Sequence, residues 1–331
     1  SGAMDTRELA KIDLNLLISL QVLIDEGNVS RAAERLFITQ PAMSKTLSRL
    51  RDLFGDPLFT RSSHGMQPTP RALDLAGGLE DILGDISRLV SEPEFDPGRF
   101  EGEICLQLSE YIGMALLPEL VRRLQSSAPR LHIRVITRVE NQLEQLALGK
   151  LDFAVHIQQS DYGPDYRVHA LGGSPPVVLV REDHPLVEQG SSWERLAHFP
   201  LINPYISDWE QAEIRRQAEA MELFQERRRG SLEISHLLTA LDVLRNTDYF
   251  MPAPAYVMRN VEATRGVTAL PPPKGGNLSL DYALVAHRRT LNSPLHNWLW
   301  QEITCTIRDL RPTLPHKQRR RVAASSNDFT P

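Results

Sequence analysis

One stretch of the chain carries side chains that can hydrogen-bond to DNA. Four apolar residues recur there at intervals of four, three and four, which predicts a helix with one buried stripe: Met43, Leu47, Leu50 and Phe54. The other face carries donor-rich side chains that can reach base edges and phosphates in a major groove: Gln40, Ser44, Lys45, Ser48 and Arg49. The chemistry that this pattern favours is recognition of duplex DNA by hydrogen bonds.

A second, shorter helix is expected directly before this one. Asn28 is a natural N-cap, and the adjacent Ala32 and Ala33 suit a close helix crossing. Thr39 can cap the following helix, and Pro41 fits its first turn, where the missing N–H is no loss. These signals predict a helix-turn-helix. The alternative is an ordinary helical hairpin with a solvated polar face.

The local charge favours DNA over that alternative. Residues 28–71 hold seven Lys or Arg and three acids, whereas the whole chain has a formal net charge of −5. The basic residues are Arg31, Arg35, Lys45, Arg49, Arg51, Arg61 and Arg71, and the acids are Glu34, Asp52 and Asp56. A local positive excess of this kind attracts a phosphate backbone.

The flanking segments complete a compact unit. Residues 14–26 predict a first helix that ends at Gly27, with Leu16, Leu20, Leu23 and Ile24 on its inner face. Residues 56–70 contain Pro57, Gly65, Pro68 and Pro70, which forbid a helix and favour a hairpin-like wing.

Pro70 opens a long helix that we expect to end near Val90. Its apolar residues follow the 3.5-residue period of a coiled-coil seam: Ala72, Leu75, Leu79, Ile82, Ile86 and Leu89. Packing of this helix on its own domain is the alternative. Its position directly after the basic unit favours a dimer seam. Residues 91–100, with two prolines and a glycine, predict a hinge.

From residue 101 the hydrophobic period alternates between those of strands and helices. Strands are expected at 104–108, 131–135, 151–157, 232–234 and 278–287, and helices at 112–124, 143–148, 236–245 and 294–310. This alternation predicts a parallel sheet with helices on both faces. The tail, residues 312–331, is basic, lacks apolar periodicity and is expected to be disordered.

Composition and motifs disfavour several function classes. With 331 residues the chain is long enough for two or three domains. It lacks the G-x-S-x-G, H-E-x-x-H, G-x-x-x-x-G-K and G-x-G-x-x-G motifs, and its ten histidines lack metal-ligand spacing, so we expect no enzyme, no metal and no cofactor. Cys105 and Cys305 are interpreted as small apolar residues; a redox-sensing pair is the alternative. No secretory leader or membrane-length apolar run is visible, which predicts a cytoplasmic protein.

Three short motifs together resemble a known family. Ala32–Leu36 fits A-A-x-x-L, Thr39–Ser44 fits S/T-Q-P-A-x-S, and Leu58–Arg61 fits L-F-x-R. This combination resembles the winged helix-turn-helix of LysR-type transcriptional regulators. The Pro68–Ala72 segment resembles the branch that contains the nodulation regulators.

The resemblance implies roles for further residues. Arg61 matches an arginine that contacts the DNA backbone and minor groove, and Thr69 matches a phosphate contact. The DNA-binding residues expected in this chain are therefore Arg31, Thr39, Gln40, Pro41, Ser44, Lys45, Ser48, Arg49, Arg61 and Thr69. Leu75, Leu79, Ile82, Ile86 and Leu89 are the expected dimer contacts, in a homodimer that assembles to a homotetramer.

The resemblance also implies the domain order. Residues 1–70 are expected to form the winged helix-turn-helix, 71–90 the linker helix, and 101–311 a periplasmic-binding-protein-like effector domain of two α/β lobes. The lobes comprise about 101–175 plus 277–311, and 176–276. Residues 149–154 resemble the family's G-x-L-D-x-A motif. The resemblance also implies strands at 177–181, the first of the second lobe, and at 250–252.

A small-molecule effector is expected in the cleft between the lobes, beyond the carboxyl ends of strands. The candidate residues are Ser109, Tyr111, Arg138, Val139, His156, Ile157, Tyr205, Ser207, His236 and Phe250. Members that bind small carboxylates place Ser or Thr where this chain has Tyr111 and Val139. Tyr111, Tyr205 and His236 favour a bulkier or aromatic effector, although each is alternatively a packing residue. A competing function is a solute-binding receptor without DNA function; retention on DNA that weakens as salt rises distinguishes the two.

Overall fold

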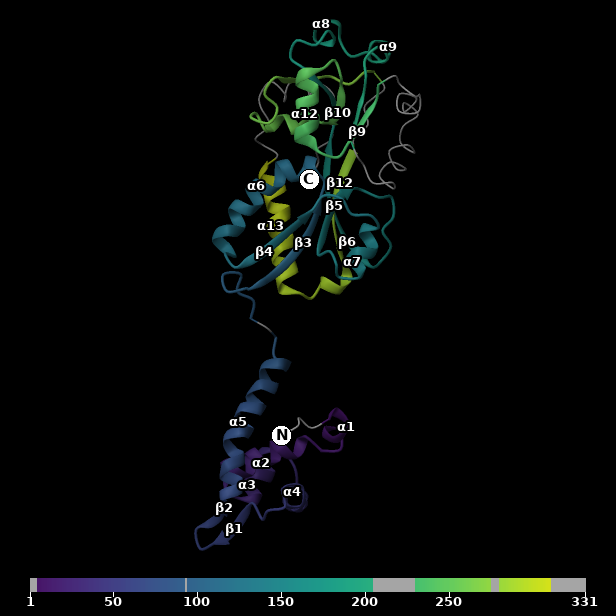
Figure 1. The fold of residues 1–331 in the computed structure, drawn as a ribbon. Coiled ribbons are helices and arrows are strands. Elements are labelled where there is room, and N and C mark those ends of the chain that lie inside the picture. Colours follow the sequence, from purple (N-terminus) through teal and green to yellow (C-terminus); the bar gives the residue numbers. More distant parts are fainter. Residues whose placement is uncertain (1–4, 93, 205–229, 275–279, 311–331) are drawn as a thin grey trace. The chain divides into compact units, whose positions relative to one another are not determined.

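The computed structural model describes residues 5–92, 94–204, 230–274 and 280–310 (Figure 1). The chain divides into two compact units, Ser1–Glu94 and Phe95–Pro331, and the division falls inside the predicted hinge. The predicted basic tail lies outside the described residues, as do Tyr205 and Ser207.

The first unit contains five helices and one hairpin within its described residues. They are α1 (Thr6–Leu9), α2 (Asn15–Glu26), α3 (Val29–Arg35), α4 (Gln40–Phe54), β1 (Phe59–Ser62), β2 (Gly65–Pro68) and α5 (Pro70–Val90). β1 and β2 pair antiparallel, which gives the hairpin-like wing predicted from the prolines. The short α1 was not predicted.

Local capping signals fix the ends of the helices in this unit. The side chain of Asn28 accepts a hydrogen bond from the backbone N–H of Arg31 at 2.9 Å, and Thr39 accepts one from Ala42 at 3.3 Å. Gly27 and Gly55 end α2 and α4 with φ of 58° and 60°, a left-handed conformation that glycine adopts without strain. The predicted helix-turn-helix is confirmed down to its caps.

The core of the first unit lies where α2, α3 and α4 meet. Its buried residues come from α2, α3, α4, the wing and the first half of α5: Leu16, Leu20, Val22, Leu23, Ala32, Ala33, Met43, Leu47, Leu50, Leu58, Phe59, Ala72 and Leu79. The exposed fractions of Ala32 and Ala33 are 0% and 2%. These small side chains allow α3 to lie close to its neighbours.

The predicted seam on α5 needs a correction. Leu79 is buried and Leu75 is partly buried, and both pack into the core of their own unit. Ile82, Ile86 and Leu89 are exposed. The periodic stripe therefore serves two purposes, because its first half packs within the domain and only its second half is available to a partner.

The second unit consists of two lobes. Lobe I contains β3 (Gly102–Leu108), α6 (Glu110–Ser127), β4 (Leu131–Ile136), α7 (Gln142–Ala147), β5 (Phe153–Ile157), β6 (Tyr166–Ser174), β12 (Leu280–His287), η3 (Arg288–Thr290) and α13 (Pro294–Leu310). Lobe II contains β7 (Pro176–Arg181), α8 (Leu186–Gln189), α9 (Trp193–Leu196), β8 (Ile202–Pro204), β9 (Leu232–Ile234), α12 (Leu237–Asn246), β10 (Met251–Pro254), η2 (Ala255–Arg259) and β11 (Val267–Leu270). The chain leaves lobe I after β6 and returns before β12.

The sequence predicted a parallel sheet, but the sheets of both lobes contain antiparallel pairs. In lobe I the strand order is β4-β3-β5-β12-β6; β3 pairs parallel with β4 and β5, but β12 runs antiparallel to β5 and β6. In lobe II β7 pairs antiparallel with β10 and β11, whereas β8 and β9 are parallel.

Helices cover both faces of the sheet in lobe I. α6 and α13 contribute to the largest core cluster on one face, together with the inward residues of β3, β5 and β12. Leu146 of α7 packs on the other face against Cys105 and Ala154. Cys105 is buried and Cys305 is half-buried, and both thiols are free.

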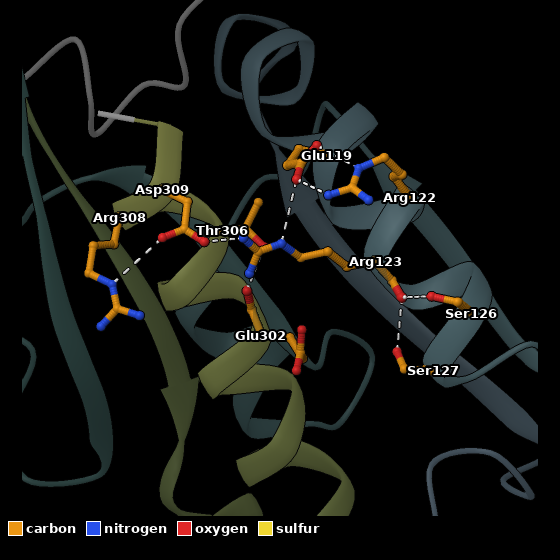
Figure 2. A network of polar contacts seen from close by, with 9 residues as sticks. All are labelled: Glu119, Arg122, Arg123, Ser126, Ser127, Glu302, Thr306, Arg308 and Asp309. Atoms are coloured by element: carbon orange, nitrogen blue, oxygen red, sulfur yellow. Dashed lines mark hydrogen bonds and ion pairs between the residues drawn. The ribbon is translucent and has the colours of Figure 1, made fainter. Parts of the chain in front are cut away.

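An ion-pair network joins α6 to α13, although the two helices are far apart in sequence (Figure 2). Arg123 of α6 pairs with Asp309 of α13 and, on its own helix, with Glu119 at 3.6 Å. Glu119 also accepts from Arg122 at 3.0 Å. The side chain of Arg123 is only 22% exposed, but Asp309 and Arg122 are 53% and 64% exposed, so solvent screens much of this network. It ties α13 to α6 within lobe I.

The G-x-L-D-x-A segment also has a structural role in lobe I. Asp152 accepts a hydrogen bond from His296 of α13 at 2.8 Å and another from the backbone N–H of Cys105 at 2.7 Å. Burial alone would raise the pKa of Asp152, but these bonds to its carboxylate outweigh burial and lower it. Asp152 thereby connects the start of β5, strand β3 and the N-terminal turn of α13.

None of the helices in the described ranges is long and apolar enough to cross a membrane.

Candidate functional site

The predicted recognition face of α4 is open to solvent. Gln40, Pro41, Ser44, Lys45, Ser48 and Arg49 are all exposed, while the opposite stripe of Met43, Leu47 and Leu50 is buried. This division results from the sequence spacing, since the buried stripe fixes which side of the helix faces outward. The polar face is therefore free to meet a macromolecule.

The basic residues around this face differ in their contacts. Arg49 forms an ion pair with Asp13 at 3.3 Å. Arg31 donates to the backbone carbonyl of Glu26 at 3.3 Å. Arg61 is exposed on the wing strand β1. Surface pairs at such distances contribute little stability and exchange readily for phosphate contacts.

Thr69 has a structural role that the sequence did not reveal. Its hydroxyl donates to Asp56 at 2.8 Å and accepts from the backbone N–H of Ala72 at 3.2 Å, so it caps α5. A hydroxyl has one proton to donate, and here Asp56 accepts it. A phosphate contact by Thr69 would require that bond to break.

A small cavity of about 40 Å³ lies where the lobes meet, with space for about three water molecules. Four of the predicted effector residues line it: Ser109, Tyr111, Arg138 and His236. Ser109 caps α6 by accepting from Ile112 at 3.3 Å, and His236 is the N-cap residue of α12. The cavity therefore lies between the N-terminal ends of two helices that come from different lobes.

Four other predicted residues lie elsewhere. Ile157 and Phe250 are buried in the cores of lobe I and lobe II, and Val139 packs at the edge of the α7 cluster. His156 is buried beside α7. Val139 follows β4, His156 and Ile157 are the last two residues of β5, and Phe250 directly precedes β10. A position near a strand end therefore does not decide whether a side chain faces the cleft or the core.

His156 is held in a buried polar network. Its Nδ1 lies in hydrogen-bonding contact with Oε1 of Gln142, and its Nε2 is 2.9 Å from the hydroxyl of Tyr162. The rings of His156 and Tyr162 are stacked, with their centroids 5.7 Å apart. Burial lowers the pKa of His156 from 6.5 to about 4, because the charged imidazolium is poorly solvated there. The residue is neutral at physiological pH.

The sequence did not identify the residue that joins the lobes at this cavity. Glu110, the first residue of α6, accepts a hydrogen bond from the backbone N–H of Leu237, the first residue of α12. Thr137 and Ser235 add hydroxyls to the cavity wall. A strand-end signal existed for Glu110, which lies between Ser109 and Tyr111, but its partner is 127 residues away in sequence.

Tyr111 extends the same contact into lobe II. It packs at the margin of the lobe II core, and its hydroxyl is 4.0 Å from the sulfur of Met251. Burial raises the pKa of Tyr111 well above its usual value, and the neighbouring Tyr282 and Glu110 raise it further. The tyrosine is therefore a neutral wall of the cavity.

A second, larger cavity of about 140 Å³ lies beside the crossing strands. Its wall is mainly apolar and includes Leu171, Ala255, Tyr256 and Ile307. Arg259 is its one charged lining residue among those described, and burial lowers the pKa of that guanidinium. In the described ranges no group of three His, Cys, Asp or Glu side chains could hold a metal ion.

Comparison with known proteins identifies both units. The family described as bacterial regulatory helix-turn-helix protein, lysR family, matches residues 14–73, and the LysR substrate binding domain matches residues 97–307. The HTH-type transcriptional regulator SyrM 2 of Sinorhizobium fredii is 32% identical over 95% of this chain and 90% of its own length. The HTH-type transcriptional activator NahR of Pseudomonas putida is 29% identical over 80% of this chain and 88% of its own length.

Solved structures give the same result for the fold. A probable transcriptional regulator from Pseudomonas aeruginosa is 27% identical, with a TM-score of 0.54, over 89% of this chain and 98% of that one. A full-length OxyR from the same species is 20% identical, with a TM-score of 0.64, over 89% of this chain and 99% of that one. The match over the helix-turn-helix is inconsistent with a solute-binding receptor that has no DNA function.

Proposed function

This chain belongs to the LysR family of DNA-binding transcription regulators, which are not enzymes, and we propose that a dimer of it reads a specific operator through α4. The family combines a DNA-binding unit with a C-terminal effector-binding domain. The SyrM relatives are in keeping with the resemblance to nodulation regulators. The observation that carries the proposal is the exposed polar face of α4.

In the proposed complex, the N-terminal part of α4 enters the major groove. Gln40 and Ser44 contact base edges, while Lys45, Ser48 and Arg49 contact phosphates or bases on the same face. Thr39 and Pro41 present the start of the helix, where unpaired backbone N–H groups favour phosphate. Arg31 and, from the wing, Arg61 contact the backbone on either side.

The exposed half of α5 supports the dimer. Ile82, Ile86 and Leu89 are spaced by four and three residues and are 49%, 44% and 83% exposed. A helix of the 21 residues of α5 is about 30 Å long, comparable to one turn of DNA. Pairing of two α5 helices would therefore fix the separation of two half-sites. Two dimers joining through their second units would give the homotetramer that the family resemblance implies.

The proposed effector site is the smaller cavity, which is lined by Ser109, Tyr111, Arg138 and His236. It is built from both lobes, so a ligand there contacts two bodies whose separation it can change. A change in the lobe arrangement would alter the spacing of the DNA-binding units and hence the affinity for the operator. Because the target is chromosomal DNA, we place the protein in the bacterial cytoplasm.

Salt-dependent DNA binding tests the proposal. The full chain should bind a selected operator with an affinity that falls steeply between 50 and 200 mM salt, since each released counterion contributes to the slope. Arg61→Ala should weaken binding to all sequences alike and reduce the slope by about one per lost phosphate contact. Arg265→Ala, which removes an exposed cation of lobe II that pairs with Glu262, is the control. A salt-independent affinity, or equal effects of the two variants, would contradict the proposal.

A further inference from the structure

The side chain of the N-cap residue does not cap the N-terminus of α12. The first N–H groups of a helix have no partner within the helix, and the aligned peptide dipoles make this end positive. His236 is the N-cap residue of α12, but its side chain accepts no capping hydrogen bond. The helix has ten residues, and its first N–H, that of Leu237, points to an acceptor outside lobe II.

That acceptor is the carboxylate of Glu110 from lobe I. One of its oxygens accepts the Leu237 N–H, so a side chain of one lobe caps a helix of the other. Glu110 also lies in the first turn of α6, where a negative charge is favourable for that helix as well. Its carboxylate is thus placed where two helix N-termini from different lobes come together.

The surrounding wall is suited to an oxyanion. Ser109, Thr137 and Ser235 supply hydroxyl groups, and Arg138 supplies a positive charge. Only about 40 Å³ of the cavity remains empty beside Glu110. Because Glu110 already accepts the Leu237 N–H, a carboxylate ligand cannot take the α12 position while Glu110 occupies it, and it would also meet the like charge of Glu110.

We propose that Glu110 is the cleft's own anion: it occupies the anion site of α12, fastens lobe I to lobe II and makes this cleft select uncharged or cationic effectors over small carboxylates. The inference rests on the proposed function of the cleft as the effector site. It also gives a physical cause to the expectation, made from Tyr111 and Val139, that small carboxylates are disfavoured. An effector that opens the lobes does so by separating Glu110 from Leu237.

Chemical rescue tests this assignment. Glu110→Ala removes the atoms from Cγ outward, which acetate reproduces, whereas Glu110→Gln removes the charge and leaves the space filled. The readouts on the full chain are the Tm of the second unit and the hydrogen exchange of the Leu237 amide, with and without acetate at constant ionic strength set with chloride. Glu144→Gln is the matched control, because Glu144 is an exposed acid in the first turn of α7, another lobe I helix.

The expected pattern separates the three variants. Glu110→Ala should lower the Tm by about 3–6 °C and speed exchange at Leu237, and acetate should reverse both changes. Glu110→Gln should also speed exchange, but acetate should not restore it because the site is filled. The wild-type chain and Glu144→Gln should show no specific response to acetate. Acetate that acts equally on all four proteins, or unchanged exchange at Leu237 in Glu110→Ala, would overturn the inference.

DNA binding measured on the same proteins separates this inference from the proposed function. If acetate fails to rescue Glu110→Ala while operator binding stays specific and salt-dependent, Glu110 is not the cleft's anion and the regulator function stands. If rescue succeeds while no variant or salt changes operator affinity, the assignment of Glu110 stands and the cleft does not control DNA binding.

Discussion

Replacement of Ile82 and Ile86 by Asp should disrupt the α5 seam. These side chains are 49% and 44% exposed, so a partner helix can bury about half of each. Full burial of an isoleucine contributes about 1.5–3 kcal/mol, so half contributes roughly 1 kcal/mol. Two protomers bring four such side chains, and their loss costs about 4 kcal/mol, or about a thousandfold in the dissociation constant. Charged replacements add the cost of desolvating carboxylates.

Sedimentation equilibrium of the full chain measures this change. The double variant should lose the association step that runs through α5, while its circular dichroism stays that of the wild type because both positions lie outside the unit's core. Leu73→Asp is the matched control, since Leu73 is 58% exposed on α5 and lies nine residues, or about two and a half turns, from Ile82. An unchanged dissociation constant for the double variant, or equal losses in both variants, would refute the seam.

Two further predictions concern stability. Phe37 lies in the turn before α4 with φ of 53° and is 96% exposed. Asn tolerates this left-handed conformation better than Phe, so Phe37→Asn should raise the unfolding free energy, measured by denaturant titration, by about 1 kcal/mol. A lower unfolding free energy would show that the ring makes stabilising contacts. The folded pKa of His156, about 4, is below its unfolded value of 6.5, so the unfolded chain binds more protons between these values and stability falls as the pH drops through that window. The loss should reach about 2 kcal/mol at pH 5 relative to pH 7.5, and His156→Gln should flatten this part of the curve; an unchanged pH profile would contradict the buried neutral imidazole.

Local signals predicted the first unit well. Asn28 and Thr39 cap helices as expected, because a capping bond joins residues only three positions apart and so is encoded locally. The period of the α5 stripe was also correct. The partner of its first half was wrong, because Leu75 and Leu79 look the same in sequence whether they meet a second chain or the core of their own unit.

The second unit depends on contacts between distant residues, and there prediction was weaker. β6 was missed because Gly172 and Gly173 interrupt its apolar pattern, although pairing with β12 holds it in the sheet. The effector residues were chosen by strand ends, which selected Ser109 and His236 correctly for the cavity wall but also core residues such as Ile157. The strand end also pointed to Glu110, but its role could not be predicted because its partner is the N-terminus of a helix in the other lobe.

The most direct test of the central claim, that α4 reads DNA, is a comparison of sequence discrimination by Gln40→Ala and Ser44→Ala with that of the wild type. For each protein the ratio of affinities for the selected operator and for a scrambled duplex is measured at one fixed salt concentration. We expect each substitution to reduce this ratio by about tenfold or more, with little change in binding to the scrambled duplex, as the loss of base contacts requires. Discrimination that stays at the wild-type level in both variants would contradict the account.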